Sequence, residues 1–295
     1  MKPLAFILIL LGLILIPLSG ISKPKDVIVA IIDTGVDSSH PALKGKIIEE
    51  KSFVPGILPI DTNGHGTHVA GTIVLLNPDA KIISLKYYSS LSSAKQNGLS
   101  GIEALRYAVE RRVNIINYSG GGTPFNDEEY EILKRAEVRG ILVVAAAGND
   151  GKNLDLPDNK YYPACYDLKN IISVASIGPE GLSISSNYGA ISVDIAALGE
   201  DIIGPYLNHR WARMSGTSMS TAVISGAASL ILQKMPYTPP KEVEEILYFT
   251  GERLPELIGK VRSEKTFSLI NLRDYLERKP HERRSREASS NYQTR

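Results

Sequence analysis

Short apolar runs alternate with longer helical patterns through most of this chain, and that alternation constrains its fold more than any other feature. The runs are rich in Val, Ile and Ala and almost continuous, as strands are when a parallel sheet buries both of their faces. The segments between them carry apolar residues at helical spacing, with Ile102, Leu105 and Val109 set among charges. This order predicts an α/β fold with a doubly wound, mostly parallel sheet and helices on both faces, in three layers. The predicted strands are residues 27–32, 81–86, 113–118, 141–146, 171–175 and 191–196, and the predicted helices are 65–76, 100–112, 127–139 and 217–234.

Length and charge narrow the classes of function. With 295 residues, 43% of them hydrophobic, the chain can bury one large core and still carry extensions. Its formal net charge is +1, which supplies no strong field for nucleic acid or for an anionic membrane. We therefore expect no nucleic-acid partner.

The first residues have the pattern of a targeting segment. Lys2 precedes an apolar run of about 15 residues from Leu4 to Leu18, short of the roughly 20 that span a bilayer. Small residues follow, as they do at signal-peptidase sites. We expect a signal peptide over residues 1–22 and a secreted or cell-envelope protein, with an uncleaved membrane anchor as the alternative.

Cys165 is the single cysteine, so the chain cannot form an intramolecular disulfide. It lies in the segment Tyr161-Tyr162-Pro163-Ala164-Cys165-Tyr166, with no histidine nearby in sequence. We expect a packed thiol rather than a nucleophile.

Four short motifs each place one reactive side chain among small residues: 31–35, 63–71, 145–150 and 214–221. Asp33 ends the first predicted strand, Asn149 follows the fourth, and Ser119-Gly120-Gly121 ends the third. His65 and Ser218 each open a predicted helix. Ligands of doubly wound sheets bind beyond the carboxyl ends of the strands, so we expect these residues at one rim.

Their chemistry suits peptide hydrolysis. A serine must lose its proton as it attacks, and a histidine with a reference pKa of about 6.5 can take that proton. An aspartate fixes the imidazole tautomer and stabilises the imidazolium. We assign Ser218 as nucleophile, His65 as general base and then acid, and Asp33 as the orienting carboxylate. Gly64 and Gly66 flank His65 and are expected to leave room for the substrate and the serine.

Each assignment has a rival nearby. Asp37 lies in a polar loop and is expected to cap a turn. His68 precedes Val-Ala-Gly and is expected to pack inward; the two histidines also lack the Glu and the spacing of a zinc motif. Ser215 and Ser220 compete with Ser218, but Ser218 directly follows Gly-Thr where a helix begins.

The chain order Asp, His, Ser differs from the Ser, Asp, His order of α/β-hydrolases, and the four motifs resemble those of the subtilisin-like serine proteases over residues 26–277. The resemblance implies a catalytic domain over 26–277, preceded by the signal peptide 1–22. Residues 278–295 are dense in Arg, Glu and Ser, so we expect a disordered polar tail.

The resemblance also implies the binding residues. Asn149 matches the oxyanion-hole asparagine, with the Ser218 backbone N–H as the second donor. Substrate would bind along Ser119, Gly120 and Gly121 and beside Ala147 and Gly148, adding itself as a strand. Many relatives carry a bulkier apolar residue where Gly120 stands, so we expect a roomier pocket for large apolar side chains before the cleaved bond. Tyr162-Pro163 matches a position where the family often has a cis bond.

Three departures from the family pattern follow. About half a dozen residues separate Gly20 from the first predicted strand, too few for a pro-segment, so we expect unaided folding or a folding partner in trans. Ala42 replaces an acidic calcium ligand and the loop 77–80 looks short, so we expect no cofactor and no calcium at the usual site, another cation site remaining open. Ala222 replaces a proline and should reduce helix preorganisation without abolishing the chemistry.

We therefore predict a monomeric serine endopeptidase of broad specificity that acts on proteins or peptides, with an inhibitor as a further expected type of partner. Two alternatives remain. A catalytically silent peptide-binding module would normally have lost a catalytic residue. A peptide ligase or macrocyclase would pass the same acyl-enzyme to an amine instead of water.

Overall fold

The computed structural model describes residues 26–278 and confirms the predicted fold class. Nine strands run in the order β11-β12-β8-β6-β5-β4-β1-β3-β2, and β7 pairs with β6. From β2 to β12 every neighbouring pair is parallel, while β11 and β7 are antiparallel additions. The strands are β1 Ile28–Asp33, β2 Ile47–Ser52, β3 Lys81–Lys86, β4 Ile115–Tyr118, β5 Leu142–Ala146, β6 Ile171–Gly178, β7 Gly181–Leu182, β8 Ile195–Leu198, β11 Glu252–Arg253 and β12 Lys265–Thr266.

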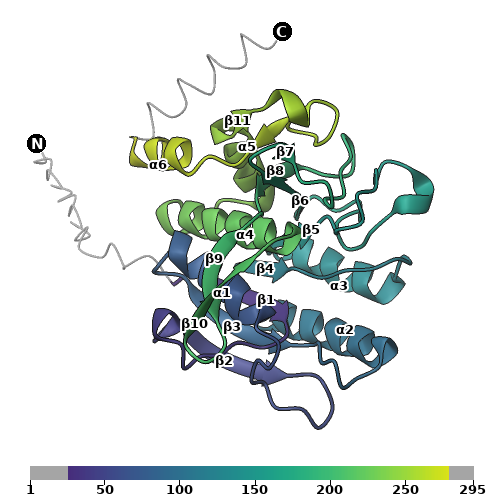
Figure 1. The fold of residues 1–295 in the computed structure, drawn as a ribbon, viewed down its shortest axis with the longest axis vertical. Helices are drawn as coiled ribbons and strands as arrows, with labels where there is room; N and C mark the ends of the chain where they lie inside the picture. The colour runs from purple at the N-terminus through teal and green to yellow at the C-terminus, as the bar shows by residue number, and fades with distance from the viewer. Residues whose placement is uncertain (1–25, 279–295) are drawn as a thin grey trace, which may run out of the picture.

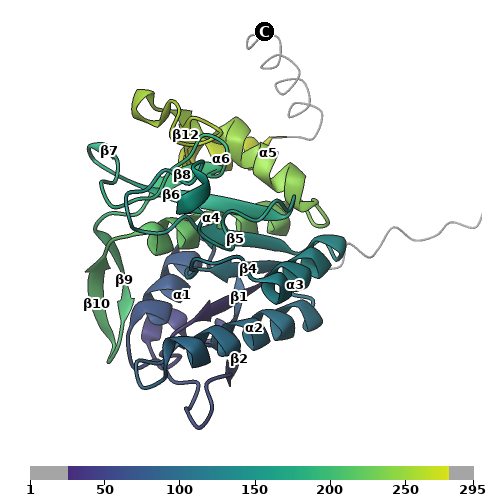
Figure 2. The same cartoon turned by 90° about the vertical axis from the view of Figure 1, so that its right-hand side faces the viewer.

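Helices cover both faces of this sheet (Figures 1 and 2). On one face α4 packs against β4, β5, β6 and β8 and against α1, with α5 and α6 beside it. On the other face α2 and α3 lie side by side. A separate antiparallel hairpin, β9 and β10, packs on α1. The bounds are α1 His65–Leu76, α2 Ala94–Glu110, α3 Asp127–Val138, α4 Thr217–Lys234, α5 Pro240–Thr250, α6 Leu269–Glu277, β9 Ile202–Tyr206 and β10 Arg210–Met214.

The strands are apolar throughout because alternate side chains enter two different cores. In β1, Val29 and Ile31 belong to the core beneath α1 and α4, whereas Ala30 and Ile32 belong to the core beneath α2 and α3. Burial of both faces provides the large apolar area that stabilises the sheet.

Strand β1 is also the point where the winding of the sheet reverses. Its neighbours are β3 on one side and β4 on the other, and the chain builds outward in both directions from there. In open α/β sheets this reversal opens a crevice at the carboxyl ends of the strands. Asp33 is the last residue of β1 and therefore stands at that crevice.

Two predicted elements begin at least four residues away from the predicted start. Helix α2 begins at Ala94 rather than residue 100, because Ser93 caps it by accepting from Gln96 N. The strand predicted at 191–196 is found at Ile195–Leu198, since the N–H groups of Ile191 and Ser192 are held instead by the carboxylate of Asp155.

Within residues 26–278, no helix has both the length and the apolar character needed to cross a membrane. The predicted signal peptide, 1–22, and nearly all of the predicted polar tail, 278–295, lie outside the described residues.

Candidate active site

Asp33 and His65 meet at the carboxyl edge of the sheet. The end of β1 carries Asp33, and His65 is the first residue of α1. His65 Nδ1 lies 2.7 Å from Asp33 Oδ1, which also accepts the backbone N–H of Thr34 at 2.7 Å. Asp33 is 4% exposed while the histidine side chain is 25% exposed. The carboxylate is therefore buried beneath the imidazole, and Nε2, the ring nitrogen that does not contact Asp33, can accept a proton.

The surroundings of His65 set its proton affinity. Burial by itself would lower the pKa of the imidazole, but the charge of Asp33 and its hydrogen bond outweigh burial, with a smaller contribution from Asp61. The net result is a pKa above the ordinary 6.5. An imidazole of this kind is a stronger base, at the cost of being protonated over more of the acid range.

Ser218 lies at the start of α4, which follows Gly216 with φ of 140°. Its Oγ donates to the carbonyl of Ser119 at 3.0 Å, and Ser119 Oγ donates back to the carbonyl of Ser218 at 3.1 Å. Across the described residues no hydrogen bond joins Ser218 to His65. Ser119, the hydrogen-bond partner of Ser218, lines one cavity of about 280 Å³ together with His65 and Asp33, and Ser218 is linked to that cavity through Ser119.

The side chain of Asn149 has a fixed orientation. Its Oδ1 accepts the backbone N–H of Thr217 at 2.9 Å and the Thr217 hydroxyl at 3.1 Å. A backbone N–H can only donate, so the oxygen must face Thr217 and the amide nitrogen must face away from it. Asn149 is exposed, which leaves that N–H₂ group available as a donor next to the start of α4.

The glycines beside His65 serve a different purpose from the predicted one. A side chain at Gly66 would collide with the carbonyl of Gly35 and come within 3.1 Å of the Asp33 carboxylate. A side chain at Gly64 would collide with the ring of Tyr206. These glycines therefore allow α1 to approach β1 and the β9 strand closely, rather than leaving room for substrate.

The predicted substrate-binding segments lie against tyrosines. The hydroxyl of Tyr87 occupies the space that a side chain at Gly120 would take, so the room expected there is already filled. The ring of Tyr161 lies against both Gly121 and Gly148, about 3 Å from the position that a Cβ of Gly148 would take. The gap between these two segments is thus bounded by an aromatic ring.

Asp61 is a residue that the sequence reasoning missed. It is 4% exposed and its carboxylate accepts five hydrogen bonds, from Thr34 Oγ1 and from the donors Asn63 N, Gly64 N, Thr67 N and Thr67 Oγ1. These bonds fix the loop that ends at His65. The N-cap of α1 is Gly64, and Asp61 stands three residues before it, where no capping preference would have revealed it.

Lys86 was also missed. It ends β3 and is 1% exposed, with Nζ donating to Thr34 O at 2.6 Å and to Ile60 O at 2.9 Å. Burial lowers the pKa of this ammonium, and the charges of Asp61 and Asp33 partly oppose that effect. Lys86 thus ties the backbone after Asp33 to the backbone before Asp61. A lysine ending an otherwise apolar, doubly buried strand was the available signal.

The rival residues lie elsewhere, as expected. His68 is fully buried, and its Nε2 bonds to Ile202 O at 2.9 Å. Asp37 caps its own turn by accepting the N–H and hydroxyl of Ser39. Ser220 Oγ donates to Ala197 O, and Ser215 Oγ accepts from Asp201 N.

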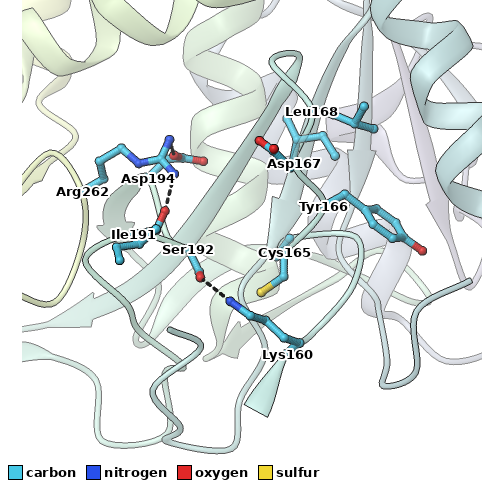
Figure 3. Close-up of a pocket in the computed structure, with 11 residues that line it drawn as sticks. Lys160, Cys165, Tyr166, Asp167, Leu168, Ile191, Ser192, Asp194 and Arg262 are labelled. Atoms are coloured by element: carbon cyan, nitrogen blue, oxygen red, sulfur yellow. Dashed lines mark hydrogen bonds and ion pairs between the residues drawn. The ribbon is translucent and has the colours of Figure 1, made fainter. Parts of the chain in front are cut away.

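Cys165 lies away from the predicted catalytic residues, beside a cavity of about 350 Å³ (Figure 3). It is partly buried, and burial raises the pKa of its thiol. In the same cavity wall Lys160 Nζ donates to Ser192 Oγ, and Arg262 pairs with Asp194 at 2.9 Å. A thiol with a raised pKa is a poor nucleophile, which agrees with the predicted packed role.

The predicted match at Tyr162-Pro163 also bears on this region. The Tyr162-Pro163 peptide bond is cis. In the part of the chain that the structure describes, no group of three or more His, Cys, Asp or Glu side chains is placed to hold a metal ion.

Comparisons with known proteins identify the family of the chain. A model of the subtilase family matches residues 24–267. An intracellular serine protease of Paenibacillus polymyxa is 37% identical over 227 residues, 72% of this chain and 68% of that protein. Subtilisin DY of Bacillus licheniformis is 33% identical over 243 residues, 79% of this chain and 86% of that protein. A chain from a solved structure described as the structural basis of subtilase cytotoxin SubAB assembly has a TM-score of 0.73 and 25% identity, covering 86% of this chain and 90% of that one. The chain belongs to the subtilase family of serine proteases.

Proposed function

We propose that this protein is an endopeptidase that cleaves peptide bonds through Asp33, His65 and Ser218 by way of an acyl-enzyme. The observation that carries the proposal is the 2.7 Å contact between the buried Asp33 carboxylate and His65 Nδ1. With Nδ1 bonded to the carboxylate as an N–H donor, the imidazole presents Nε2 without a proton. That is the tautomer a general base requires.

In the first step, Ser218 Oγ attacks the carbonyl carbon of the scissile bond as its proton passes to His65 Nε2. The hydroxyl must first turn away from Ser119 O, to which it donates at 3.0 Å. The tetrahedral intermediate then collapses, the C–N bond breaks, and His65 gives the proton to the leaving amine. Water repeats the sequence on the ester, which releases the acid and restores the serine.

The oxyanion of the intermediate needs donors already in place. Asn149 supplies the first, because Thr217 fixes its carboxamide with the amide nitrogen free. The backbone N–H of Ser218, at the positive end of α4, supplies the second. Both donors come from segments that are held by hydrogen bonds before substrate arrives, so little reorganisation is required.

Substrate would bind as an added strand along residues 119–121, with the side chain before the cleaved bond entering between that segment and residues 147–148. We retain a preference for apolar side chains there, supported by the ring of Tyr161 against Gly121 and Gly148. Gly120 gives this pocket no extra room, because Tyr87 occupies that space.

We further propose that residues 26–277 form the catalytic domain and that the protein acts outside the cytoplasm as a monomer. The apolar run before Pro17 supports export. The relatives include a protease named intracellular as well as Subtilisin DY, so names do not decide the location. Cell fractionation with N-terminal sequencing of the mature protein tests it: export with cleavage near residue 22 is expected, and an intact cytoplasmic chain would contradict it.

We also propose that the usual calcium site of the family is absent, because Ala42 stands where many relatives have an acidic ligand and the loop 77–80 is short. Refolding yield with and without calcium tests this. Recovery of full activity from the purified chain in a chelator would support calcium-independent folding.

A fluorophosphonate probe tests the catalytic assignment directly. The probe forms an adduct on a serine only where nucleophile, base and oxyanion donors are assembled. Intact mass should show one adduct on the wild type and none on Ser218→Ala. A folded wild type that takes up no probe would favour the silent peptide-binding module instead.

A ligase or macrocyclase differs from a protease only in the group that accepts the acyl chain. Incubation of the enzyme with a peptide and an added amine, followed by mass spectrometry, separates the two. We expect products that are mostly acids; a majority of amides would assign the ligase.

A further inference from the structure

A larger cavity lies next to the proposed active site. Its volume is about 690 Å³, and Tyr87 and Tyr88 line both this cavity and the smaller one that contains Asp33, His65 and Ser119. The remaining walls come from the first turns of α2 and α3, which lie side by side, and from Gly121 and Gly122 (Figure 2). A peptide lying along residues 119–121 would therefore pass the mouth of this cavity.

One wall of the cavity holds an acidic residue where an apolar one would be expected. The side of α3 that faces the core carries Glu129, Ile132, Leu133 and Ala136, which is the i, i+3, i+4, i+7 spacing of an apolar stripe. Glu129 occupies the first position of that stripe and is 8% exposed. Burial of a carboxylate costs free energy, so a residue that merely fills space here would be apolar.

The partners of Glu129 keep its carboxylate in position without neutralising it. Tyr166 Oη donates to Oε2 at 2.8 Å, and the hydroxyl of Tyr118 bonds to the same carboxyl group. Burial raises the pKa of Glu129, and these two hydrogen bonds lower it in part. Among residues 26–278 no Lys, Arg or His forms an ion pair with Glu129.

Aromatic rings form much of the remaining wall. Tyr87 and Tyr118 stand edge to face, with centroids 5.9 Å apart, and Tyr88 and Tyr162 complete the set. Faces of such rings attract cations, most strongly where water is excluded. The other charged residues that line the cavity do not replace Glu129 as the site for a cation. Glu128 is exposed and already paired with Arg106 at 2.5 Å, and Lys95 is exposed and carries a positive charge.

We propose that this cavity binds a cationic side chain of the substrate, Lys or Arg, at a position N-terminal to the residue before the cleaved bond, and that Glu129 selects it. The proposal rests on the proposed proteolytic function. The substrate cation would supply the counter-charge that the chain does not give Glu129, while its methylenes would lie along the tyrosine rings.

The test uses matched fluorogenic peptides that carry arginine or its neutral analogue citrulline at each of the second, third and fourth positions before the cleaved bond. At one of these positions the wild type should show about a tenfold higher kcat/KM for arginine, the effect of one charge-assisted contact. Glu129→Gln keeps an acceptor for Tyr166, and it should bring the two rates within about twofold.

Glu131→Gln is the matched control. Glu131 lies on the same helix with its side chain 61% exposed, so its loss changes the net charge equally and should leave the arginine preference unchanged. Cleavage by the wild type without an arginine preference at any of these positions, or an equal preference in Glu129→Gln, would overturn the inference alone. A wild type that cleaves no peptide and takes up no fluorophosphonate would overturn the proposed function as well.

Discussion

Ser218 and Ser119 are joined in both directions, because the hydroxyl of each donates to the backbone carbonyl of the other at 3.0 and 3.1 Å. This reciprocal pair fixes the segment proposed to bind substrate against the turn that carries the proposed nucleophile. The Ser218 hydroxyl also remains hydrogen-bonded to the Ser119 carbonyl until it turns toward His65. Substrate position and serine position are therefore set together.

Ser119→Ala should weaken this link without removing the carbonyl that holds Ser218. One hydrogen bond contributes about 1 kcal/mol, so we expect kcat/KM to fall by about fivefold, with the fluorophosphonate adduct still formed. Steady-state kinetics on a peptide substrate measure the change. A loss of a hundredfold or more would show that Ser119 does more than hold the two segments together.

Asn149→Ala should lower kcat with little effect on KM. The amide donor contacts negative charge that develops after substrate has bound, and loss of one such donor costs about 10²–10³ in kcat, a figure measured in subtilisin, a relative of this protein. Asp150→Ala, one residue further on and also exposed, is the control and should keep most of the activity. An equal loss in both variants would point to damage to the loop instead of the loss of a donor.

The pH dependence of kcat/KM follows from the raised pKa of His65. The base must be neutral, so activity should fall as pH drops through a midpoint above 6.5. In Asp33→Asn the residual activity should have a lower midpoint, because burial, which lowers the pKa, is then less opposed. A wild-type midpoint below 6.5 would contradict the proposed pairing.

The raised pKa of His65 should also make the protein less stable as pH rises, whereas its activity increases. Because the folded-state pKa of His65 is raised, its protonated form stabilises the fold fully below the unfolded value near 6.5, and this contribution is lost as pH rises through the folded value. Urea unfolding of Ser218→Ala across that range measures the loss, since the variant cannot digest itself.

Lys86→Met should destabilise the protein. Its ammonium satisfies the carbonyls of Thr34 and Ile60 in a buried site, and leaving two such acceptors unpaired costs about 2 kcal/mol or more. Urea unfolding in the Ser218→Ala background gives the value. Lys81→Met, on the same strand but with a more exposed side chain, should change stability by about 0.5 kcal/mol or less. If the two variants lose the same free energy of unfolding, the buried hydrogen bonds of Lys86 do not contribute specially to stability.

The sequence predicted most of what local patterns determine. Helices α1 and α4 and strand β3 have the predicted bounds, because dense apolar residues and small residues around His65 and Ser218 leave few alternative structures. Asp33, His65 and Ser119 were placed at one rim because the carboxyl ends of parallel strands share an edge.

What the sequence did not predict depends on contacts between distant segments. Tyr206 fills the space at Gly64 from about 140 residues away, and Lys86 bonds to the backbone carbonyls of Thr34 and Ile60, which come from two separate segments. The hairpin β9–β10 and the helices α5 and α6 were also not predicted. In α5 the buried residues Val243, Ile246 and Leu247 stand at helical spacing, so a signal for that helix was present in the sequence. The hairpin depends instead on its packing against α1.

The ring of Tyr161 should set the size of the side chain accepted before the cleaved bond. The ring lies against Gly121 and Gly148, which belong to the two segments between which that substrate side chain would enter. A large substrate ring must therefore compete with Tyr161 for space. Tyr161→Gly should raise kcat/KM for phenylalanine relative to alanine at that position by about tenfold, since each extra buried methylene contributes roughly 0.8 kcal/mol. Tyr237→Gly is the control, because Tyr237 is 96% exposed and lines neither of the two cavities. If phenylalanine is already preferred over alanine by the wild type and Tyr161→Gly leaves that ratio unchanged, the ring does not limit the pocket.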